Sequence, residues 1–353
     1  MIDSQGYAAL IPKGQLQPFS FQRRQPAAND IQIDILYCGI CHSDLHSVDN
    51  DMGNSLYPIV PGHEIIGRVV AVGESVRNFK IGDMAGIGCI VDSCRHCPSC
   101  ETSRQQFCVE GFTSTFNARE RISGAPTLGG YSTNYVVDEN YALHIPANLN
   151  TAAAAPLLCA GITTYAPLKR YGTGPGKRVG VLGLGGLGHL AIKMARAMGA
   201  TPVIITTSPD KTADAARLGA EAFILSGDTT QMAQHVGTLD LILDTVSGPH
   251  DPNAYLQLLK LEGVMCLIGV PTQPLPVSSL SLVFGQKSLT GSFIGGVAET
   301  QEMLEFCSQH DITADIELIR IQDVNIAYER MQRNDVKYRF VIDMESMRSG
   351  PAE

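Results

Sequence analysis

The chain has 353 residues, of which 44% are hydrophobic and 17% are charged, with a formal net charge of -9 at pH 7. This length exceeds what one hydrophobic core usually holds, so we expect two domains. The negative charge and the lack of long Lys or Arg runs argue against nucleic acid and anionic membranes as partners.

The N-terminal stretch, residues 1–19, lacks the basic start and the apolar block of a secretion signal. No later stretch reaches the roughly 18 apolar residues that a membrane-spanning helix needs. We therefore expect a cytoplasmic protein. Disulfides are disfavoured in that reducing compartment, and the clustering of the ten cysteines indicates metal binding.

Short apolar and β-branched runs, separated by Gly and Pro, fill the chain up to about residue 150. Residues 31–36 alternate between apolar and polar side chains, and residues 66–72 have the composition of a second strand. Many short strands with turn residues between them predict a β-rich, barrel-like domain.

The pattern changes after Pro156, where strand-like and helix-like segments begin to alternate. The predicted strands are residues 178–182, 203–206, 222–225, 239–244 and 264–270. Between the first two, Leu187, Leu190 and Met194 would share one helix face. This alternation predicts a parallel, doubly wound sheet. It is lost near residue 291, and residues 338–343 resemble a final strand.

A glycine-rich turn separates the first of these strands from its helix. It consists of Gly183, Leu184, Gly185, Gly186, Leu187 and Gly188. In the dinucleotide fingerprint the first glycine permits the tight turn, the second lets backbone amides approach a pyrophosphate, and the last allows close packing of helix on strand. The alternative is a flexible loop, but the position between a strand and a helix favours dinucleotide binding.

The residues after the second strand indicate which dinucleotide binds. An NAD site usually carries an acidic residue about 20 residues after the glycine turn. This chain instead has Thr206, Thr207, Ser208 and Lys211. Asp210 is explained as the first-turn acid of the next helix. Three hydroxyls with a lysine suit a 2′-phosphate, so we expect NADP; NAD is the alternative if these are only turn residues.

Four cysteines lie together on a loop-like segment: Cys94, Cys97, Cys100 and Cys108. Four thiolates can surround one zinc ion with no open position, which is typical of a structural site. The alternatives are disulfides, an iron–sulfur cluster and a zinc-ribbon-like nucleic-acid module. We favour zinc. A reducing compartment disfavours disulfides, and the negative net charge of the chain argues against a nucleic-acid module.

A second set of ligand-type residues is spread over three segments, around Cys41, His63 and Cys159. Two thiolates and one imidazole bind zinc and leave a fourth position open, as catalytic zinc requires. By residue type alone Cys38 and His42 compete with Cys41, and Cys159 could be a small core residue. Spacing does not show whether these distant positions converge.

Neighbouring polar residues would complete the chemistry of such a site. Ser43 could pass a proton, and His46 could exchange it with water. Asp44 could orient His63 from behind. We expect the remaining cysteines, Cys38, Cys89, Cys266 and Cys307, to be ordinary buried or half-buried thiols.

In their order and spacing these motifs resemble the medium-chain, zinc-dependent alcohol dehydrogenase family, and most of all its cinnamyl alcohol dehydrogenase branch. The resemblance covers essentially the whole chain, and its most specific element is Gly-His-Glu-Ile-Ile-Gly at residues 62–67. It implies Cys41, His63 and Cys159 as ligands of a catalytic zinc, with Glu64 behind the metal. It also implies Ser43 and His46 as the proton relay.

The same resemblance implies contacts with the coenzyme. Thr163 matches a position that faces the nicotinamide. Positions in strand ends and loops along the coenzyme correspond to Thr245, Gly269, Ser292, Phe293 and Ile294. The segment from Thr206 to Lys211 matches the 2′-phosphate site that is usual in the branch. One departure is the absence of Trp, often found near Thr113 in plant members to hold an aromatic ring; Phe112 and Phe116 could compensate.

The resemblance implies an α/β fold with two parts. A β-rich, barrel-like (GroES-like) catalytic domain would comprise residues 1–156 and 292–353, and a Rossmann domain with a doubly wound parallel sheet would comprise residues 157–291. Family members usually form homodimers, here through residues 288–294. The expected reaction is hydride transfer between NADP(H) and a primary alcohol or aldehyde, aromatic or medium-chain aliphatic. The alternatives are a polyol dehydrogenase, where Glu commonly replaces the third zinc ligand, and a non-catalytic NADP-binding redox sensor.

Overall fold

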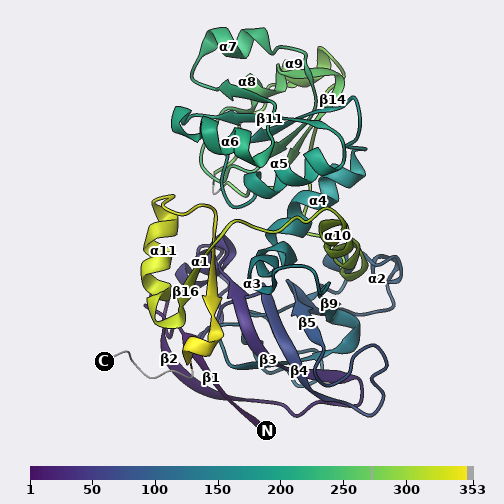
Figure 1. The fold of residues 1–353 in the computed structure, drawn as a ribbon, viewed down its shortest axis with the longest axis vertical. Helices are drawn as coiled ribbons and strands as arrows, with labels where there is room; N and C mark the ends of the chain where they lie inside the picture. Colours follow the sequence, from purple (N-terminus) through teal and green to yellow (C-terminus); the bar gives the residue numbers. More distant parts are fainter. Residues whose placement is uncertain (272, 348–353) are drawn as a thin grey trace. The chain divides into compact units, whose positions relative to one another are not determined.

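A computed structural model describes residues 1–271 and 273–347, and its chain divides into two compact units. Met1–Cys159 and Gly295–Glu353 form the first unit, so both ends of the chain belong to it (purple and yellow in Figure 1). Ala160–Ile294 forms the second. Residues 157–159 thus group with the first unit and residues 292–294 with the second. Residues 348–353 of the expected catalytic domain lie outside the described residues.

Strands dominate the first unit. β1 (Ile2–Ala8) pairs with β2 (Gln17–Arg23), and β6 (Ile90–Asp92) pairs with β7 (Thr113–Ser114). A seven-stranded sheet follows the order β16-β17-β3-β4-β5-β9, with β8 paired to β3. Its strands are β3 (Asp30–Gly39), β4 (Ile65–Val72), β5 (Met84–Ile87), β8 (Asn134–Asp138), β9 (Leu143–His144), β16 (Ile316–Arg320) and β17 (Arg339–Asp343).

Sequence periodicity explains these strands. β3 buries Ile31, Ile33 and Ile35 at alternate positions, which confirms the strand predicted from alternation. β17 comes from the far end of the chain and pairs antiparallel with β3. The helices of this unit are α1 (His42–Asp49), α2 (Pro98–Glu101), α3 (Thr151–Ala154), α10 (Val297–Gln309) and α11 (Val324–Gln332).

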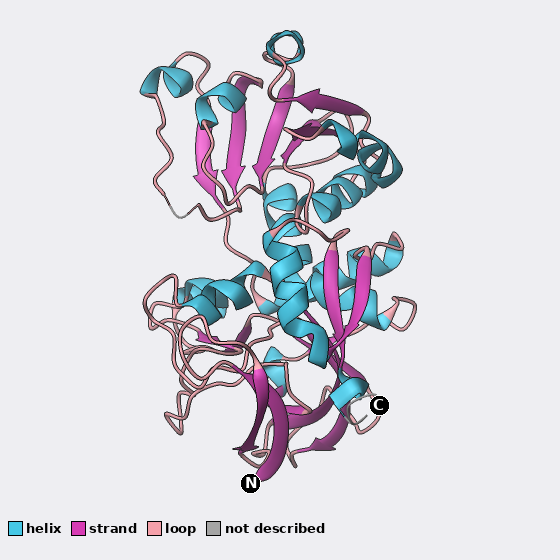
Figure 2. Cartoon of the chain, turned by 90° about the vertical axis from the view of Figure 1, so that its left-hand side faces the viewer, coloured by secondary structure: helices cyan, strands magenta, loops and turns pink. Residues whose placement is uncertain are grey.

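Parallel strands form the sheet of the second unit, in the order β12-β11-β10-β13-β14-β15. Figure 2 shows several of them side by side as magenta arrows. They are β10 (Arg178–Leu182), β11 (Thr201–Thr206), β12 (Ala222–Leu225), β13 (Leu239–Asp244), β14 (Leu259–Leu267) and β15 (Ser288–Gly291). The strand order reverses between β10 and β13, so a doubly wound sheet of this kind offers its ligand site at their carboxyl ends.

Helices connect these strands, as the alternation predicted. α4 (Ala160–Arg170) precedes β10, and the connecting helices are α5 (Gly188–Ala197), α6 (Thr212–Leu218), α7 (Thr229–Gln234), α8 (Pro252–Leu256) and α9 (Ser279–Val283). The segment after Ser208 differs slightly from expectation. It starts as a 3-10 turn, Pro209–Lys211, before α6 begins, and the Ser208 side chain makes no capping hydrogen bond.

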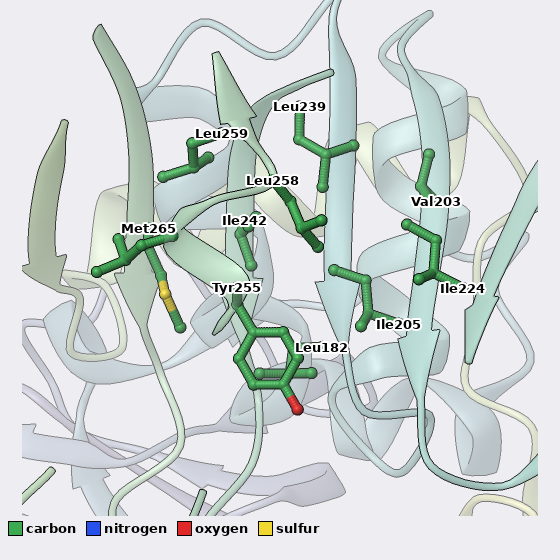
Figure 3. Packing of buried hydrophobic residues seen from close by; sticks show 11 residues of the cluster. Leu182, Val203, Ile205, Ile224, Leu239, Ile242, Tyr255, Leu258, Leu259 and Met265 are labelled. Carbon is green, nitrogen blue, oxygen red and sulfur yellow. The ribbon is translucent and has the colours of Figure 1, made fainter. Parts of the chain in front are cut away.

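Apolar side chains from neighbouring strands hold the second unit together. Figure 3 shows this cluster, which includes Leu182, Val203, Ile205, Ile224, Leu239, Ile242, Tyr255, Leu256, Leu258, Leu259 and Met265. Burying one large aliphatic side chain contributes about 1.5–3 kcal/mol. The core therefore fixes the strand ends that follow it, which carry the predicted coenzyme residues.

Among the described residues, none of the helices alone has the length and apolar composition to cross a membrane. One bent pair, Thr151–Leu158 with Ala160–Arg170, meets that criterion by length and composition only.

Candidate active site and coenzyme site

The first helix of the chain starts at the centre of the predicted metal site. Cys41 precedes α1, and the Asp44 carboxylate accepts the backbone N–H of Cys41 at 2.8 Å. This is the reciprocal arrangement of a capping box. Asp44 is fully buried and also accepts the N–H of Gly62 at 3.0 Å. One carboxylate therefore joins the start of α1 to the backbone just before His63.

The predicted ligands of the catalytic metal lie together in the first unit. The ligand atoms of Cys41, His63, Glu64 and Cys159 all fall within 4.8 Å of one another. The sulfurs of Cys41 and Cys159 are 4.0 Å apart, although 118 residues separate them in the sequence. Nδ1 of His63 lies 3.2 Å from Asp44, which leaves Nε2 as the nitrogen for a metal. Cys38 and His42 are outside this group of ligand atoms.

Glu64 lies against a buried arginine that the sequence motifs did not bring out. Arg339 Nη2 donates to Glu64 Oε1 at 2.5 Å, and their side chains are only 5% and 0% exposed. The other oxygen, Oε2, is buried without a hydrogen-bond partner. A buried polar atom without a partner is costly, and a cation beside it would satisfy it. Two thiols, one oriented imidazole and this free oxygen fit a zinc ion.

Burial and neighbouring charges shift the pKa values of three of these residues, and the shift of Cys41 favours its thiolate. The pKa of Cys41 lies well below its ordinary value because the Cys159 thiol donates a hydrogen bond to its thiolate, with further help from His63 and Arg339. Burial lowers the pKa of His63, but the Asp44 carboxylate together with Cys89 and Cys41 outweighs it, and the net shift is upward. Burial raises the pKa of Glu64 to about 7, with Arg339 acting in the opposite direction.

The predicted proton relay lies on α1. The Ser43 hydroxyl is 3.6 Å from the Cys41 sulfur, so it lies at the metal site. His46, one turn farther along, has a partly exposed side chain, and its Nδ1 lies 2.7 Å from Asp51 Oδ2. Asp51 was not predicted from the sequence, because a carboxylate in a polar turn carries no distinguishing pattern.

Two further residues contact the ligands, although the sequence patterns assigned them no role at the metal: Phe116 was named only as a possible replacement for the absent Trp. Phe116 stacks on His63, with ring centroids 5.6 Å apart, whereas Phe112 packs against the four-cysteine cluster. Cys89 was expected to be an ordinary thiol. It is half-buried, and a side-chain interaction with Cys159 lowers the pKa of Cys89. Cys89 therefore belongs to the immediate surroundings of the ligands.

The second set of cysteines also gathers at one point. The ligand atoms of Cys94, Cys97, Cys100 and Cys108 lie within 4.8 Å of one another. The sulfurs of Cys97 and Cys100 are 3.5 Å apart, and those of Cys94 and Cys100 are 3.8 Å apart. Disulfide sulfurs lie about 2.05 Å apart, whereas four sulfurs at about 2.3 Å from zinc would be about 3.8 Å apart. These cysteines are free thiols at tetrahedral spacing.

Backbone amides also favour thiolates in this loop. Those of Val109 and Cys100 donate to Cys97 and lower its pKa to about 6. Cys97, Cys100 and Cys108 are buried, so solvent does not complete their coordination. The geometry fits a closed structural zinc site.

In the second unit the glycine turn follows β10 directly, and α5 begins at Gly188. Gly183 has φ +92°, a conformation that favours glycine. A Cβ at Gly188 would lie 2.0 Å from the Gly183 carbonyl oxygen, so helix and turn touch. A Cβ at Gly185 would meet no atom of the protein within 4 Å. Gly185 therefore borders open space beside the helix N-terminus, where a pyrophosphate fits.

The predicted 2′-phosphate residues follow β11. Thr206 is buried, and its hydroxyl accepts the N–H of Ser208 at 3.2 Å, while Thr207 is exposed. Lys211 Nζ donates to the Leu184 carbonyl at 3.0 Å. This contact brings a positive charge to the glycine turn, a useful place for recognising a phosphate.

Other predicted coenzyme residues lie at the ends of the central strands. Thr245 follows β13, and its hydroxyl donates to the Leu182 carbonyl at 2.8 Å. The N–H of Gly269 donates to Asp244, and that of Ser292 to Leu267. The Ser292 hydroxyl is buried without a hydrogen-bond partner and so could bind a ligand. Phe293 is half-exposed, Ile294 is buried, and Thr163 is buried in α4.

Comparisons with known proteins agree on one family. The family described as "Alcohol dehydrogenase GroES-like domain" matches residues 27–147, and "Zinc-binding dehydrogenase" matches residues 186–309. The chain is 50% identical over 341 residues to "Aldehyde reductase YahK" of Escherichia coli (strain K12), covering 96% of this chain and 97% of that protein.

A plant relative and a solved structure extend this agreement. "Probable mannitol dehydrogenase" of Medicago sativa is 49% identical over 341 residues, covering 96% of this chain and 94% of that protein. A structure of "CAD from Helicobacter pylori complexed with NADP(H)" matches with a TM-score of 0.92 at 39% identity, covering 98% of this chain and 99% of that one.

Proposed function

The chain belongs to the zinc-binding alcohol dehydrogenase family, and we propose that it interconverts aldehydes and primary alcohols with NADP(H). The observation that carries the proposal is the grouping of Cys41, His63 and Cys159 around one point, beside the partner-free Oε2 of Glu64. When bound, zinc polarises the substrate carbonyl and the reduced nicotinamide supplies the hydride.

The chain's own residues hold the metal and move the proton. Cys41, His63 and Cys159 would hold the metal through two thiolates and the imidazole. Asp44 keeps His63 oriented, and the Arg339 guanidinium balances the buried charge of Glu64. The Ser43 hydroxyl gives a proton to the product oxygen, and His46, held by Asp51, exchanges it with water.

We propose NADP(H) as the coenzyme for two reasons. The Lys211 ammonium group lies at the glycine turn, and the segment Thr206, Thr207 and Ser208 contains no acidic residue that would bind the ribose 2′-hydroxyl of NAD. The Helicobacter pylori relative was solved in complex with the same coenzyme. In this proposal the unit Ala160–Ile294 binds the coenzyme, and the unit of Met1–Cys159 with Gly295–Glu353 carries both zinc ions.

We also propose that the protein is a cytoplasmic homodimer. β15 ends the sheet of the second unit, so it offers an edge for pairing with a second copy. α9 precedes it in the chain, and large apolar side chains are exposed at Leu280, Val283 and Phe284. Light scattering on the purified protein should give twice the chain mass; a monomer at working concentrations would contradict this part.

The test of the reaction is direct. Protein, NADPH and a panel of aromatic and medium-chain aliphatic aldehydes are mixed, and nicotinamide absorbance is followed. We expect oxidation of NADPH with several aldehydes and a weaker response with NADH. If zinc-replete protein oxidises NADPH with none of them, the enzyme proposal fails and a non-catalytic NADP-binding role replaces it.

A polyol dehydrogenase is the second candidate, since the Medicago sativa relative carries a name of that kind. The same assay run in reverse, with NADP and mannitol beside a primary alcohol, separates the two. Turnover of mannitol alone would favour the polyol dehydrogenase.

A further inference from the structure

The two metal sites leave unused a pair of side chains on the exposed side of the cysteine loop. His96 Nε2 lies 3.1 Å from Glu110 Oε1, and the two side chains are 73% and 48% exposed. The ligand atoms of His96, Glu110 and Cys94 all lie within 4.8 Å of one another. A nitrogen, an oxygen and a sulfur thus gather around one point that solvent reaches.

The hydrogen bonds of His96 fix which ring nitrogen is available. Its Nδ1 lies 2.6 Å from the carbonyl oxygen of Cys94. A carbonyl oxygen only accepts, so Nδ1 carries the hydrogen and donates it. Nε2 is therefore the ring nitrogen that faces the Glu110 carboxylate, 3.1 Å from Oε1, and it is the nitrogen left for a metal. The same N–H to carbonyl contact orients imidazoles that bind zinc.

Neighbouring arginines hold both side chains in place. Arg95 has φ +69°, which turns the backbone between Cys94 and His96. Its guanidinium binds Asp92 at 2.9 Å and Asp138 at 2.7 Å. The second oxygen of Glu110 accepts from Arg121 at 3.1 Å, which leaves Oε1 for the pair with His96.

We propose that Cys94, His96 and Glu110 form an outer zinc position that shares the Cys94 sulfur with the structural site, and that zinc enters and leaves the structural site through it. Four thiolates around one Zn²⁺ keep a net negative charge, so the Cys94 sulfur can bridge to a second cation. An imidazole, a carboxylate and a thiolate, with water in the remaining position, suit zinc and leave it exchangeable. The inference rests on the proposed structural zinc.

The test uses the holoenzyme and zinc alone as the probe. Zinc per chain is first measured after removal of loosely bound metal. The protein is then dialysed against increasing zinc, and the exchange of its structural zinc for an added zinc isotope is followed by mass spectrometry. His96→Gln and Glu110→Gln are compared with the parent. His310→Gln is the matched control, since His310 is an exposed histidine elsewhere in the first unit.

We expect two tightly held zinc ions per chain and a third that the parent and His310→Gln bind alike. His96→Gln and Glu110→Gln should weaken the third at least about tenfold and slow isotope exchange. A baseline without a structural zinc would overturn the proposed structural site itself. The outer zinc position is refuted if the parent binds only two zinc ions, or if both variants bind the third as tightly as the parent does. The contact between His96 and Glu110 would then be only an ion pair. Unchanged exchange in the variants would refute the proposed path of the metal.

Discussion

Asp44 and His63 form the contact on which the geometry of the metal site depends: Asp44 Oδ1 lies 3.2 Å from His63 Nδ1. The other oxygen of Asp44 accepts the N–H of Cys41 and also the hydroxyl of Tyr131, at 3.2 Å. Tyr131 is fully buried, and its hydroxyl oxygen accepts a hydrogen bond from the Tyr328 hydroxyl at 3.4 Å. One carboxylate therefore positions two ligands and is itself held from the C-terminal part of the chain.

Asp44→Asn should weaken the catalytic zinc without removing the structural one. The amide keeps the shape of the carboxylate but loses its charge, and loss of such an outer partner typically costs 10–100-fold in metal affinity (about 1.4–2.7 kcal/mol). Competition with a chromogenic chelator measures both zinc ions, and the structural zinc is the internal control. If Asp44→Asn holds both zinc ions as tightly as the parent does, Asp44 does not support the catalytic zinc site.

Cys100→Ser should lose the structural zinc and destabilise the loop of residues 94–108. Its sulfur lies near those of Cys97 and Cys94, so three thiolates would remain around an open position. We expect one zinc fewer per chain and a loss of at least about 2 kcal/mol of stability. If both zinc content and thermal unfolding equal those of the parent, the cluster is not a structural zinc site.

Two glycine substitutions separate coenzyme binding from folding. Gly185→Val should fold normally, because its Cβ meets nothing within 4 Å. It should lose NADPH affinity by at least about tenfold, since the side chain fills the phosphate space.

Gly188→Val is the contrasting variant. Its Cβ would lie 2.0 Å from the Gly183 carbonyl oxygen, so it should cost about 1–3 kcal/mol or more of stability. Fluorescence titration with NADPH and urea unfolding measure the two effects; unchanged NADPH affinity in folded Gly185→Val would exclude the turn as the phosphate site.

Asp240 gives a prediction about pH. Burial acts to raise its pKa, but the Arg178 N–H and the Lys260 and Lys177 ammonium groups outweigh it, so the net shift is downward. A carboxylate with a lowered pKa stabilises the fold above its unfolded value, about 3.9, and loses that effect as pH falls through the lowered value.

Asp240→Asn should therefore cost about 1 kcal/mol at pH 7, a modest value because water screens the two partly exposed lysines. The difference from the parent should persist at pH 5 and shrink below about pH 4. Urea unfolding at several pH values tests this, and a difference that grows on acidification would contradict the assignment.

Local patterns were sufficient for much of the fold. The strands Ala222–Leu225 and Leu239–Asp244 match their predicted ranges, because apolar runs between turn residues leave little choice. The strand predicted at residues 264–270 is instead Leu259–Leu267. Its first half contains Lys260, Glu262 and Gly263, residue types that are uncommon in strands. The sequence therefore shows no strand signal there, and the segment is extended because it pairs with β13.

The site shows what sequence alone could not provide. Residue types and spacing proposed Cys41, His63 and Cys159, but only folding brings Cys159 to 4.0 Å from Cys41. Arg339 went unnoticed within the predicted last strand, although a charged residue in an otherwise apolar run is a signal of a buried ion pair. Phe116 was named only as a possible replacement for the absent Trp, and its contact with His63 could not be predicted because it depends on tertiary packing.

The most direct test of the central claim is the zinc content and aldehyde turnover of Cys159→Ala, measured beside Cys307→Ala. Both residues are buried, but the Cys307 sulfur lies near Met303 and belongs to neither metal site. We predict that Cys159→Ala folds, keeps one zinc per chain and no longer oxidises NADPH with aldehydes, while Cys307→Ala keeps two zinc ions and its activity. Cys159→Ala protein that retains both zinc ions and normal turnover would contradict the account.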